Sequence, residues 1–456
     1  MNVRKHIPVV VALITVVVWG LNFTLLKDSL SQFDPLPFTW LRYLGMLILA
    51  WTVVLVVRSP RLPPRRPRSL DVLFAAGTPL LLLGIVLGPG IELLDTAALR
   101  ALSPVTALTL GWLGALLGAR CERRYVTRIP RRLWLLSGLE AVAVLLVVGL
   151  AAWLLARARP ALGAAWTPRL PAVLALGTVA AASGPGAVAL AARILGVRRS
   201  VARVFGLAAT LATAWATLAL TLALTISPLR GSGEGGATHG WFAWLALTIG
   251  SGTLVGMLFL SFTRLRPDPE HVGVALLGAM LFAAGIGYAA DLSPLVVCGL
   301  AAALIVNGSP LRRRVRGLLA AGEHLIYGLF LIITGAVLAL PTVWVLAAAP
   351  ILWALRTAAK WAVVRYARDP LQLGAIPPQL GLATTAQGGL AVALGASFLL
   401  GDGATSGTGR PLLTTIVVGV VLAQLAAPPL MRLALRPTAL TERAPGPELT
   451  AESPVD

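Results

Sequence analysis

Two long apolar stretches of this chain, residues 171–194 and 376–399, are each interrupted by small and polar residues that could bind an ion inside a membrane. The interrupting residues are Ser183, Gly184 and Pro185 in the first stretch and Thr384, Thr385, Gln387 and Gly388 in the second. Proline lacks an N–H and glycine tolerates unwound backbone, so a helix should break at each interruption and leave carbonyl and N–H groups free. Paired breaks in corresponding parts of two halves are typical of a transport site at the bilayer midplane. The alternative is that these residues only permit a kink or close helix packing.

Titratable side chains are rare within the apolar stretches. Glu140 is the only acidic residue well inside one of them, and carboxylates are retained there chiefly where they bind ions or relay protons. We therefore treat Glu140 as a candidate proton relay, with a neutral, hydrogen-bonded carboxyl as the alternative. Glu323 and His324 form a second candidate pair, with an interfacial position as the alternative. Arg356 and Lys360 lie one helical turn apart near the end of a stretch, where we expect them to extend to the headgroups, although Lys360 stays a candidate for a core position.

Apolar stretches of about 20 residues, each long enough to cross a hydrocarbon core as a helix, recur along the whole chain. The chain is 57% hydrophobic and only 12% charged. The stretches do not alternate in polarity as the strands of a membrane barrel would. We therefore predict an all-α polytopic membrane protein with about 14 transmembrane helices. The predicted spans are 7–26, 37–57, 70–88, 100–118, 133–155, 171–194, 201–226, 241–262, 272–290, 292–307, 319–339, 341–360, 376–399 and 411–433.

The formal net charge of +20 comes mostly from Arg residues in every second loop between these stretches. By the positive-inside rule this pattern predicts a multi-pass protein of the cell (plasma) membrane with both termini cytoplasmic. A folded basic domain for nucleic acid is not indicated. The two cysteines, Cys121 and Cys298, are too few and too far apart for a disulfide or metal framework. The sequence also lacks a phosphate-binding loop and a nucleophile elbow, so we expect no cofactor, no metal site and no enzymatic activity.

A Pro-rich basic segment divides the chain. Residues 59–69 cannot be helical and predict a cytoplasmic linker, which is either a plain loop or a seam between two units. The resulting parts are a transmembrane helix pair at 1–58, the linker, a transmembrane domain at 70–435 and a disordered cytoplasmic tail at 436–456.

Short motifs in the larger domain resemble those of the cation–proton antiporter superfamily, Kef-like branch. In chain order they are LGIVLGPG at 83–90, LSP at 102–104, LGWLG at 110–114, ALAARILG at 189–196, LSPLV at 292–296, NGSP at 307–310 and QGGLA at 387–391. The resemblance implies an inverted-repeat antiporter fold with two broken crossing helices, and dimers are common in such proteins. Before the linker, VWGLNF at 18–23 and WLRY at 40–43 resemble the first helix pair of drug/metabolite (EamA-type) transporters.

The chain departs from the antiporter pattern at the ion site. Ser183-Gly184-Pro185 stands where active antiporters resemble Thr-Asp-Pro, and Thr213 and Ala214 stand where the next helix has an acidic pair. A threonine hydroxyl does not titrate near neutral pH. With Gln387 beside the second break, the predicted lining is polar and neutral.

We therefore predict a secondary active transporter, a monovalent cation:proton antiporter-like protein with a degenerate ion site. Its partners would be the lipid bilayer, a monovalent cation and protons or a small solute, and a second copy in a homodimer. One alternative is a transport-inactive antiporter relative that acts as a membrane scaffold or sensor. Another is a small-metabolite exporter of the drug/metabolite type.

Overall fold

The computed structural model describes residues 77–90, 94, 96–127, 129–158, 170–226, 241–265, 271–338, 343–373, 376–400 and 409–435. The predicted helix pair 1–58, the linker 59–69 and the tail 436–456 lie outside the described residues. The chain divides into two units, Met1–Pro67 and Arg68–Asp456, and the fold described below belongs to the second.

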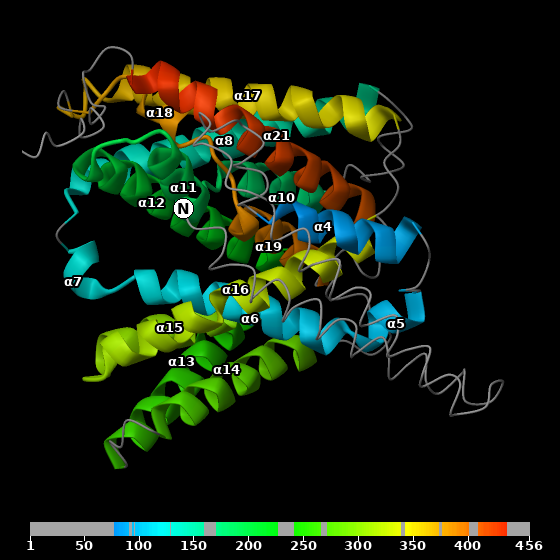
Figure 1. Cartoon of the computed structure of the whole chain (residues 1–456), viewed down its shortest axis with the longest axis vertical. Coiled ribbons are helices and arrows are strands. Elements are labelled where there is room, and N and C mark those ends of the chain that lie inside the picture. Colours follow the sequence, from blue (N-terminus) through cyan, green and yellow to red (C-terminus); the bar gives the residue numbers. More distant parts are fainter. Residues whose placement is uncertain are drawn as a thin grey trace, which may run out of the picture. The chain divides into compact units, whose positions relative to one another are not determined.

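Helices account for the regular structure of the described residues (Figure 1). They are α4 (Thr78–Ile85), the π-helical turn η2 (Val86–Gly90), α5 (Thr96–Ala101), α6 (Ser103–Arg120), α7 (Arg123–Val126), α8 (Arg131–Ala158), α10 (Leu170–Ala181), α11 (Pro185–Ile194), α12 (Arg199–Ile226), α13 (Trp241–Leu265), α14 (His271–Ala289), α15 (Pro294–Gly308), α16 (Arg312–Val337), α17 (Val343–Ala367), α18 (Leu380–Ala383), α19 (Gly389–Phe398) and α21 (Gly409–Leu435). With α10 and α11 counted as one interrupted span, eight of the described helices are long and apolar enough to cross a membrane. The prediction of an all-α polytopic membrane protein is confirmed.

Two predicted spans are longer than expected because their basic ends remain helical. The span predicted at 319–339 begins at Arg312, and the one predicted at 341–360 continues to Ala367. Arginine is a good helix former, and its long side chain reaches the headgroups from within a helix, so a basic run does not end a membrane helix.

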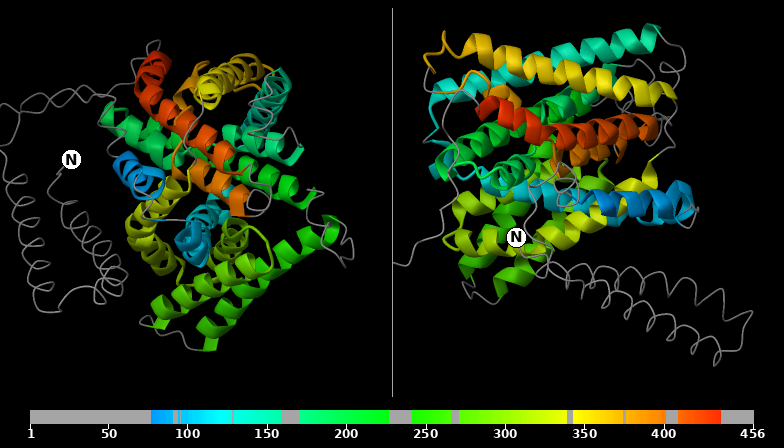
Figure 2. Two further views of the ribbon diagram at one scale, coloured as in Figure 1. Left: turned by 90° about the vertical axis from the view of Figure 1, so that its right-hand side faces the viewer. Right: turned by 45° about the horizontal axis from the view of Figure 1, so that its top comes forward.

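The described helices pack in two groups (Figures 1 and 2). We call α8, α10, α11, α12, α17, α18, α19 and α21 the core bundle, and α4, α6, α13, α14, α15 and α16 the second bundle. The core bundle contains the same arrangement of helices twice. Each copy consists of a long helix, an interrupted helix and another long helix. The first copy is α8, α10/α11 and α12, and the second is α17, α18/α19 and α21. This internal repeat brings the two interrupted helices together.

Small residues allow the closest contact in the second bundle, between α6 and α15. A Cβ atom at Gly114 would lie 1.9 Å from the carbonyl oxygen of Leu295, and one at Gly118 would lie 2.0 Å from that of Gly299. Close backbone approach through such small residues is the usual way in which helices associate in lipid, where the hydrophobic effect supplies little attraction.

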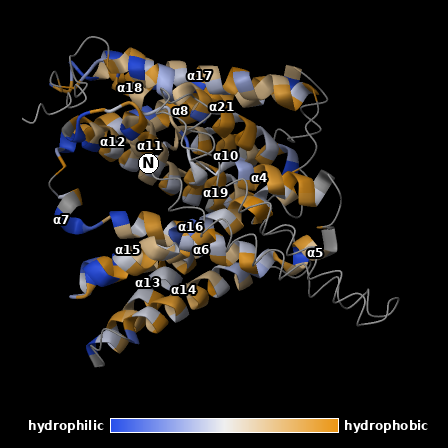
Figure 3. Cartoon of the chain, viewed as in Figure 1, coloured by the Kyte–Doolittle hydropathy of each residue, from blue (hydrophilic) through white to orange (hydrophobic). Residues whose placement is uncertain are grey.

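Large apolar residues are exposed along the long helices, and hydrophobic residues colour most of the length of these helices in Figure 3. On α8 they are Leu135, Leu139, Val142, Leu146 and Leu150, and on α13 they are Phe242, Leu254, Met257, Leu258 and Phe262. Hydrophilic residues gather instead at the end of the bundles where α7 lies (Figure 3). An apolar belt with polar ends is the surface that a lipid bilayer requires.

Candidate transport site at the helix crossing

The two interrupted helices meet at their breaks. Residues 182–184 separate α10 from α11, and residues 384–388 separate α18 from α19. The N–H of Gly184 donates to the carbonyl oxygen of Ala386 at 2.9 Å, and a Cβ at Gly184 would lie 2.4 Å from the backbone nitrogen of Gly388. The unwound segments are therefore in direct backbone contact. Two broken crossing helices were predicted and are confirmed. The alternative of a kink alone was wrong, but the close packing that it also proposed is present, because Gly184 lets the two breaks touch.

Local sequence explains why each helix restarts where it does. Pro185 begins α11, where its missing N–H removes no helical hydrogen bond. Gly184 before it and Gly388 before α19 have extended backbones, and neither helix start is capped by a side chain. The crossing thus collects the carbonyl ends of α10 and α18 and the N–H ends of α11 and α19.

Arg356 of α17 is buried within these carbonyl ends. Its Nε donates to Ala180 O at 2.6 Å, its Nη2 to Ala182 O at 2.9 Å and its Nη1 to Thr385 O at 2.8 Å. Only 2% of the residue is exposed, so the expectation that Arg356 extends to the headgroups was wrong. Carbonyls at the end of an interrupted helix carry partial negative charge and lack helical partners, which favours a guanidinium there over one in the headgroups.

Lys360, one turn further along α17, is fully buried and bonded to a carboxylate. Its ammonium forms an ion pair with Oε1 of Glu140 on α8 and donates to Oγ of Ser183 at 2.9 Å. The headgroup position expected for Lys360 was therefore also wrong, and its candidacy for a core position is the part that the structure supports. Of the candidate relay residues, Glu140 is the one that the structure brings to the crossing, as half of an ion pair.

Both basic residues lie on the face of α17 that the structure buries. Along α17 the buried residues recur every three or four positions, which marks one helix face. They are Val345, Ala348, Ala349, Leu352, Arg356, Lys360 and Val364. Arg356 and Lys360 continue this stripe. The exposed positions of α17 also include large apolar residues such as Leu346 and Ile351, so the sequence alone did not distinguish the buried face.

The other predicted polar lining residues, Thr213, Thr384, Thr385 and Gln387, are buried, and most of their polar atoms bond to nearby backbone. Gln387 Nε2 donates to Val179 O at 3.0 Å and to Ala182 O at 3.3 Å. Thr213 Oγ1 donates to the carbonyl oxygens of Ser183 and Ala209. The hydroxyls of Thr384 and Thr385 donate to carbonyls of α18, the helix that ends directly before them, and Ala214 contributes no polar side-chain atom. The carbonyls at the end of α10 are consequently bonded to Arg356 and Gln387.

Glu323 and His324 are not part of this cluster. They lie near the middle of α16 in the second bundle, where Glu323 is half-buried and His324 is exposed.

Basic side chains outnumber acidic ones at the crossing. Among the described residues buried there, Arg356 and Lys360 are basic and Glu140 alone is acidic. The ends of α11 and α19 add partial positive charge, of about half an elementary charge each. The end of α10 and the single turn of α18 add partial negative charge. The crossing therefore carries an excess of positive charge.

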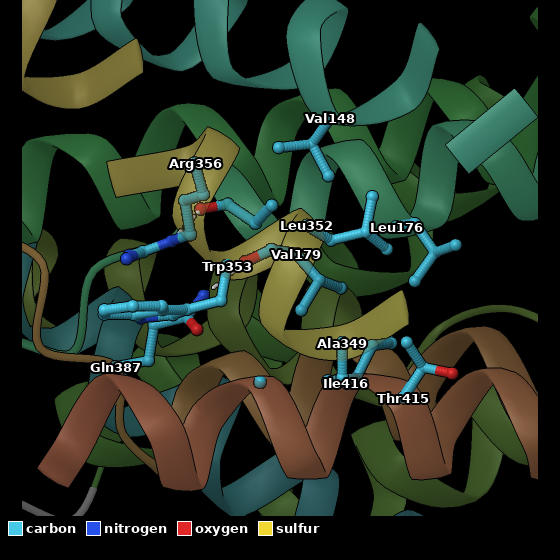
Figure 4. Close-up of a pocket in the computed structure, with 12 residues that line it drawn as sticks. Val148, Leu176, Val179, Ala349, Leu352, Trp353, Arg356, Gln387, Thr415 and Ile416 are labelled. Atoms are coloured by element: carbon cyan, nitrogen blue, oxygen red, sulfur yellow. Dashed lines mark hydrogen bonds between the residues drawn. The ribbon is translucent and has the colours of Figure 1, made fainter. Parts of the chain in front are cut away.

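A cavity of about 40 Å³ lies beside Arg356, toward the Val343 end of α17 (Figure 4). Its apolar lining comes from α8, α10, α17 and α21 and includes Val148, Leu176, Val179, Leu352 and Ile416. Its polar lining consists of Arg356, Gln387, Trp353 and Thr415. The indole Nε1 of Trp353 is buried and has no hydrogen-bond partner. Sequence analysis did not single out Trp353, since one tryptophan in an apolar helix carries no distinguishing signal.

Comparison with known proteins gives a likeness at the level of structure. No family model matches the chain, and no curated protein matches it. The chain is similar to the structure of the sodium proton antiporter MjNhaP1 from Methanocaldococcus jannaschii at pH 8, with a TM-score of 0.60 and 14% identity over 88% of this chain and 100% of that one. It is also similar to a structure of MjNhaP1 from an electron-microscopy map, with a TM-score of 0.56 and 15% identity over 90% of this chain and 99% of that one. At this identity the likeness shows the fold alone, which is the fold of MjNhaP1.

Proposed function

We propose that the chain is a secondary active transporter that exchanges a monovalent cation for protons, with Glu140 as the exchanging carboxylate. One observation carries the proposal. A buried carboxylate lies at the crossing of two interrupted helices, paired with the ammonium of Lys360, which also donates to the hydroxyl of Ser183. The antiporter fold of the similar structures supports it, because function in this fold depends on the groups at the crossing.

The ion pair allows exchange at constant charge. When a cation binds to Glu140 and to Ser183 Oγ, the ammonium of Lys360 leaves the carboxylate and releases one proton to solvent. The site then holds the Glu140 carboxylate and one metal cation, where before it held the Glu140 carboxylate and the Lys360 ammonium. Since charge inside a membrane is costly, such one-for-one exchange avoids burying a second net charge.

The site is degenerate in its ligands. Arg356 and Gln387 already bond the carbonyls that the end of α10 would offer to a cation. A cation would have the Glu140 carboxylate, the Ser183 hydroxyl and water. Monovalent cations bind weakly to so few ligands, and we expect an apparent KM for cation in the millimolar range or above.

The experiment is cation-induced proton flux in proteoliposomes, with Na⁺, K⁺ and Li⁺ tested separately at several pH values. Glu140→Gln should abolish the flux because it removes the exchangeable charge. Glu122→Gln is the matched control, since Glu122 is also a buried carboxylate but is paired with Arg312 and Arg316 at the end of α6, away from the crossing. Equal flux in Glu140→Gln and wild type would refute the role of Glu140.

A second candidate is a transport-inactive relative that serves as a membrane scaffold or sensor. The observation that favours it is that Arg356, Lys360 and Glu140 are each bonded to other groups of the chain. A folded wild-type protein without flux for any of the three ions would support this candidate. Small-metabolite export, the third hypothesis, rests on the EamA-like sequence before the linker.

We propose that the whole chain lies in the cell membrane with both termini cytoplasmic. Residues 1–58 would form an EamA-like helix pair, fused through the linker 59–69 to the antiporter domain 70–435. We further propose that two copies form a homodimer. Correct insertion and full stability after removal of residues 1–66 would argue against the fused helix pair as an integral part.

A further inference from the structure

We propose that the cavity beside Arg356 is a binding site for a small monovalent anion, with the Arg356 guanidinium and the Trp353 indole N–H as its donors. Neither residue belongs to the cation site at Glu140, so this proposal is independent of the one above.

The polar lining of the cavity is rich in donors. Trp353 Nε1, a donor only, is buried without a partner. A guanidinium has five N–H donors, and the structure uses three of them on Ala180, Ala182 and Thr385, which leaves one on each Nη. The Thr415 hydroxyl donates to Pro411 O. A buried donor without a partner destabilises the fold, so an acceptor ligand bound to the Trp353 N–H would remove that cost.

Charge selects an anion rather than a cation. Arg356 lines the cavity, and among the described residues no carboxylate lines it. The pair of Glu140 and Lys360 is neutral as a unit, which leaves the Arg356 charge in excess at the crossing. In Figure 4 the ring of Trp353 lies below Arg356, and both side chains line the cavity. Charge-assisted hydrogen bonds from such donors are roughly twice as strong as neutral ones.

Size and lining restrict the anion further. A volume of about 40 Å³ exceeds what one water molecule needs and suits a ligand of a few heavy atoms. The apolar wall formed by Val148, Leu176, Val179, Leu352 and Ile416 suits a methyl group next to the charged oxygens. Multiply charged anions are disfavoured because each further buried charge adds a desolvation cost. A short monocarboxylate such as acetate meets all three conditions.

The test is equilibrium binding of radiolabelled acetate to the purified full chain in lipid nanodiscs, in chloride-free buffer. Acetamide is the matched competitor because it has nearly the same shape without the charge. We expect saturable acetate binding that excess acetamide does not displace. The absence of saturable binding to folded protein, or displacement by acetamide as effective as that by unlabelled acetate, would overturn the proposal.

Two tryptophan variants locate the site. Trp353→Phe keeps an aromatic ring but removes the donor, and it should weaken acetate binding about tenfold, as expected for one hydrogen bond to a charged group. Trp361→Phe, on the same helix but 37% exposed, is the control and should bind as wild type does. Unchanged affinity in a folded Trp353→Phe protein would exclude Trp353 as a donor and contradict the proposal. Because no ion flux is measured, the result is separate from that of the Glu140→Gln experiment.

Discussion

Arg356 and Lys360 are one turn apart on α17, yet their charges are satisfied in different ways. Arg356 bonds to three backbone carbonyls, which keep their partial charge at any pH. Lys360 bonds to a carboxylate and a hydroxyl, and a carboxylate can instead bind a proton or a metal cation. Arg356 therefore holds the two breaks together permanently, whereas Lys360 is the group whose place a transported cation could take.

The ion pair makes a prediction about stability. Lys360→Met leaves the Glu140 carboxylate buried without its partner, and breaking a buried pair in this way costs about 3–5 kcal/mol. We expect the single variant to unfold at a clearly lower temperature or denaturant concentration in detergent. The double variant Glu140→Gln, Lys360→Met should recover most of the loss because no unpaired charge remains.

Arg365→Met serves as the control for this series, since Arg365 is an exposed basic residue on the same helix. It should change stability by less than about 0.5 kcal/mol. If Lys360→Met lowered stability as little as Arg365→Met does, the ion pair would contribute little to the stability of the folded state.

At the scale of the helices, the sequence indicates where helices form and break, but not which groups they contact. Apolar stretches predicted the long helices, and Gly184, Pro185 and Gly388 predicted the breaks, because backbone restriction is a local property. The partners of Arg356 are Ala180, Ala182 and Thr385, which are distant in sequence and bond through carbonyl groups that every residue has. No residue type signals such a partner, so only the folded chain could reveal it.

Close contact between the two breaks leads to a prediction for one glycine. A Cβ added at Gly184 would come within 2.4 Å of the Gly388 backbone, which cannot move aside as a flexible side chain could. Gly184→Ala should therefore push the crossing apart, lower stability by about 1–3 kcal/mol and reduce transport. Gly186→Ala, two residues later, is the control because nothing lies within 4 Å of its Cβ position. Thermal unfolding and flux should both distinguish the variants, and similar behaviour of the two would show that the crossing tolerates separation.

At the scale of the whole described fold, the core bundle and the second bundle meet where α19 packs against α6, α15 and α16 and where α12 packs against α13. Apolar side chains make up much of the contact around α19. Apolar contacts are non-directional and can be exchanged for similar ones, so they permit one bundle to slide against the other. Alternating access in transporters of this architecture is a rigid motion of one part around the binding site. The proposed function therefore requires the bundles to move, while an inactive relative would not need this motion.

A reversible cross-link between the bundles tests that requirement. Ser293 caps α15 in the second bundle, Ser397 belongs to α19 in the core bundle, and their hydroxyl oxygens are 2.5 Å apart. Replacing both by cysteine, with Cys121 and Cys298 changed to serine, should place two thiols within disulfide reach. Oxidation should stop cation-induced proton flux and reduction should restore it, while each single-cysteine variant stays active under both conditions. Flux that persists in a fully cross-linked protein would mean that ions pass without sliding of α19 along α15. The exchange would then have to occur by local rearrangement of Lys360 and Glu140 alone.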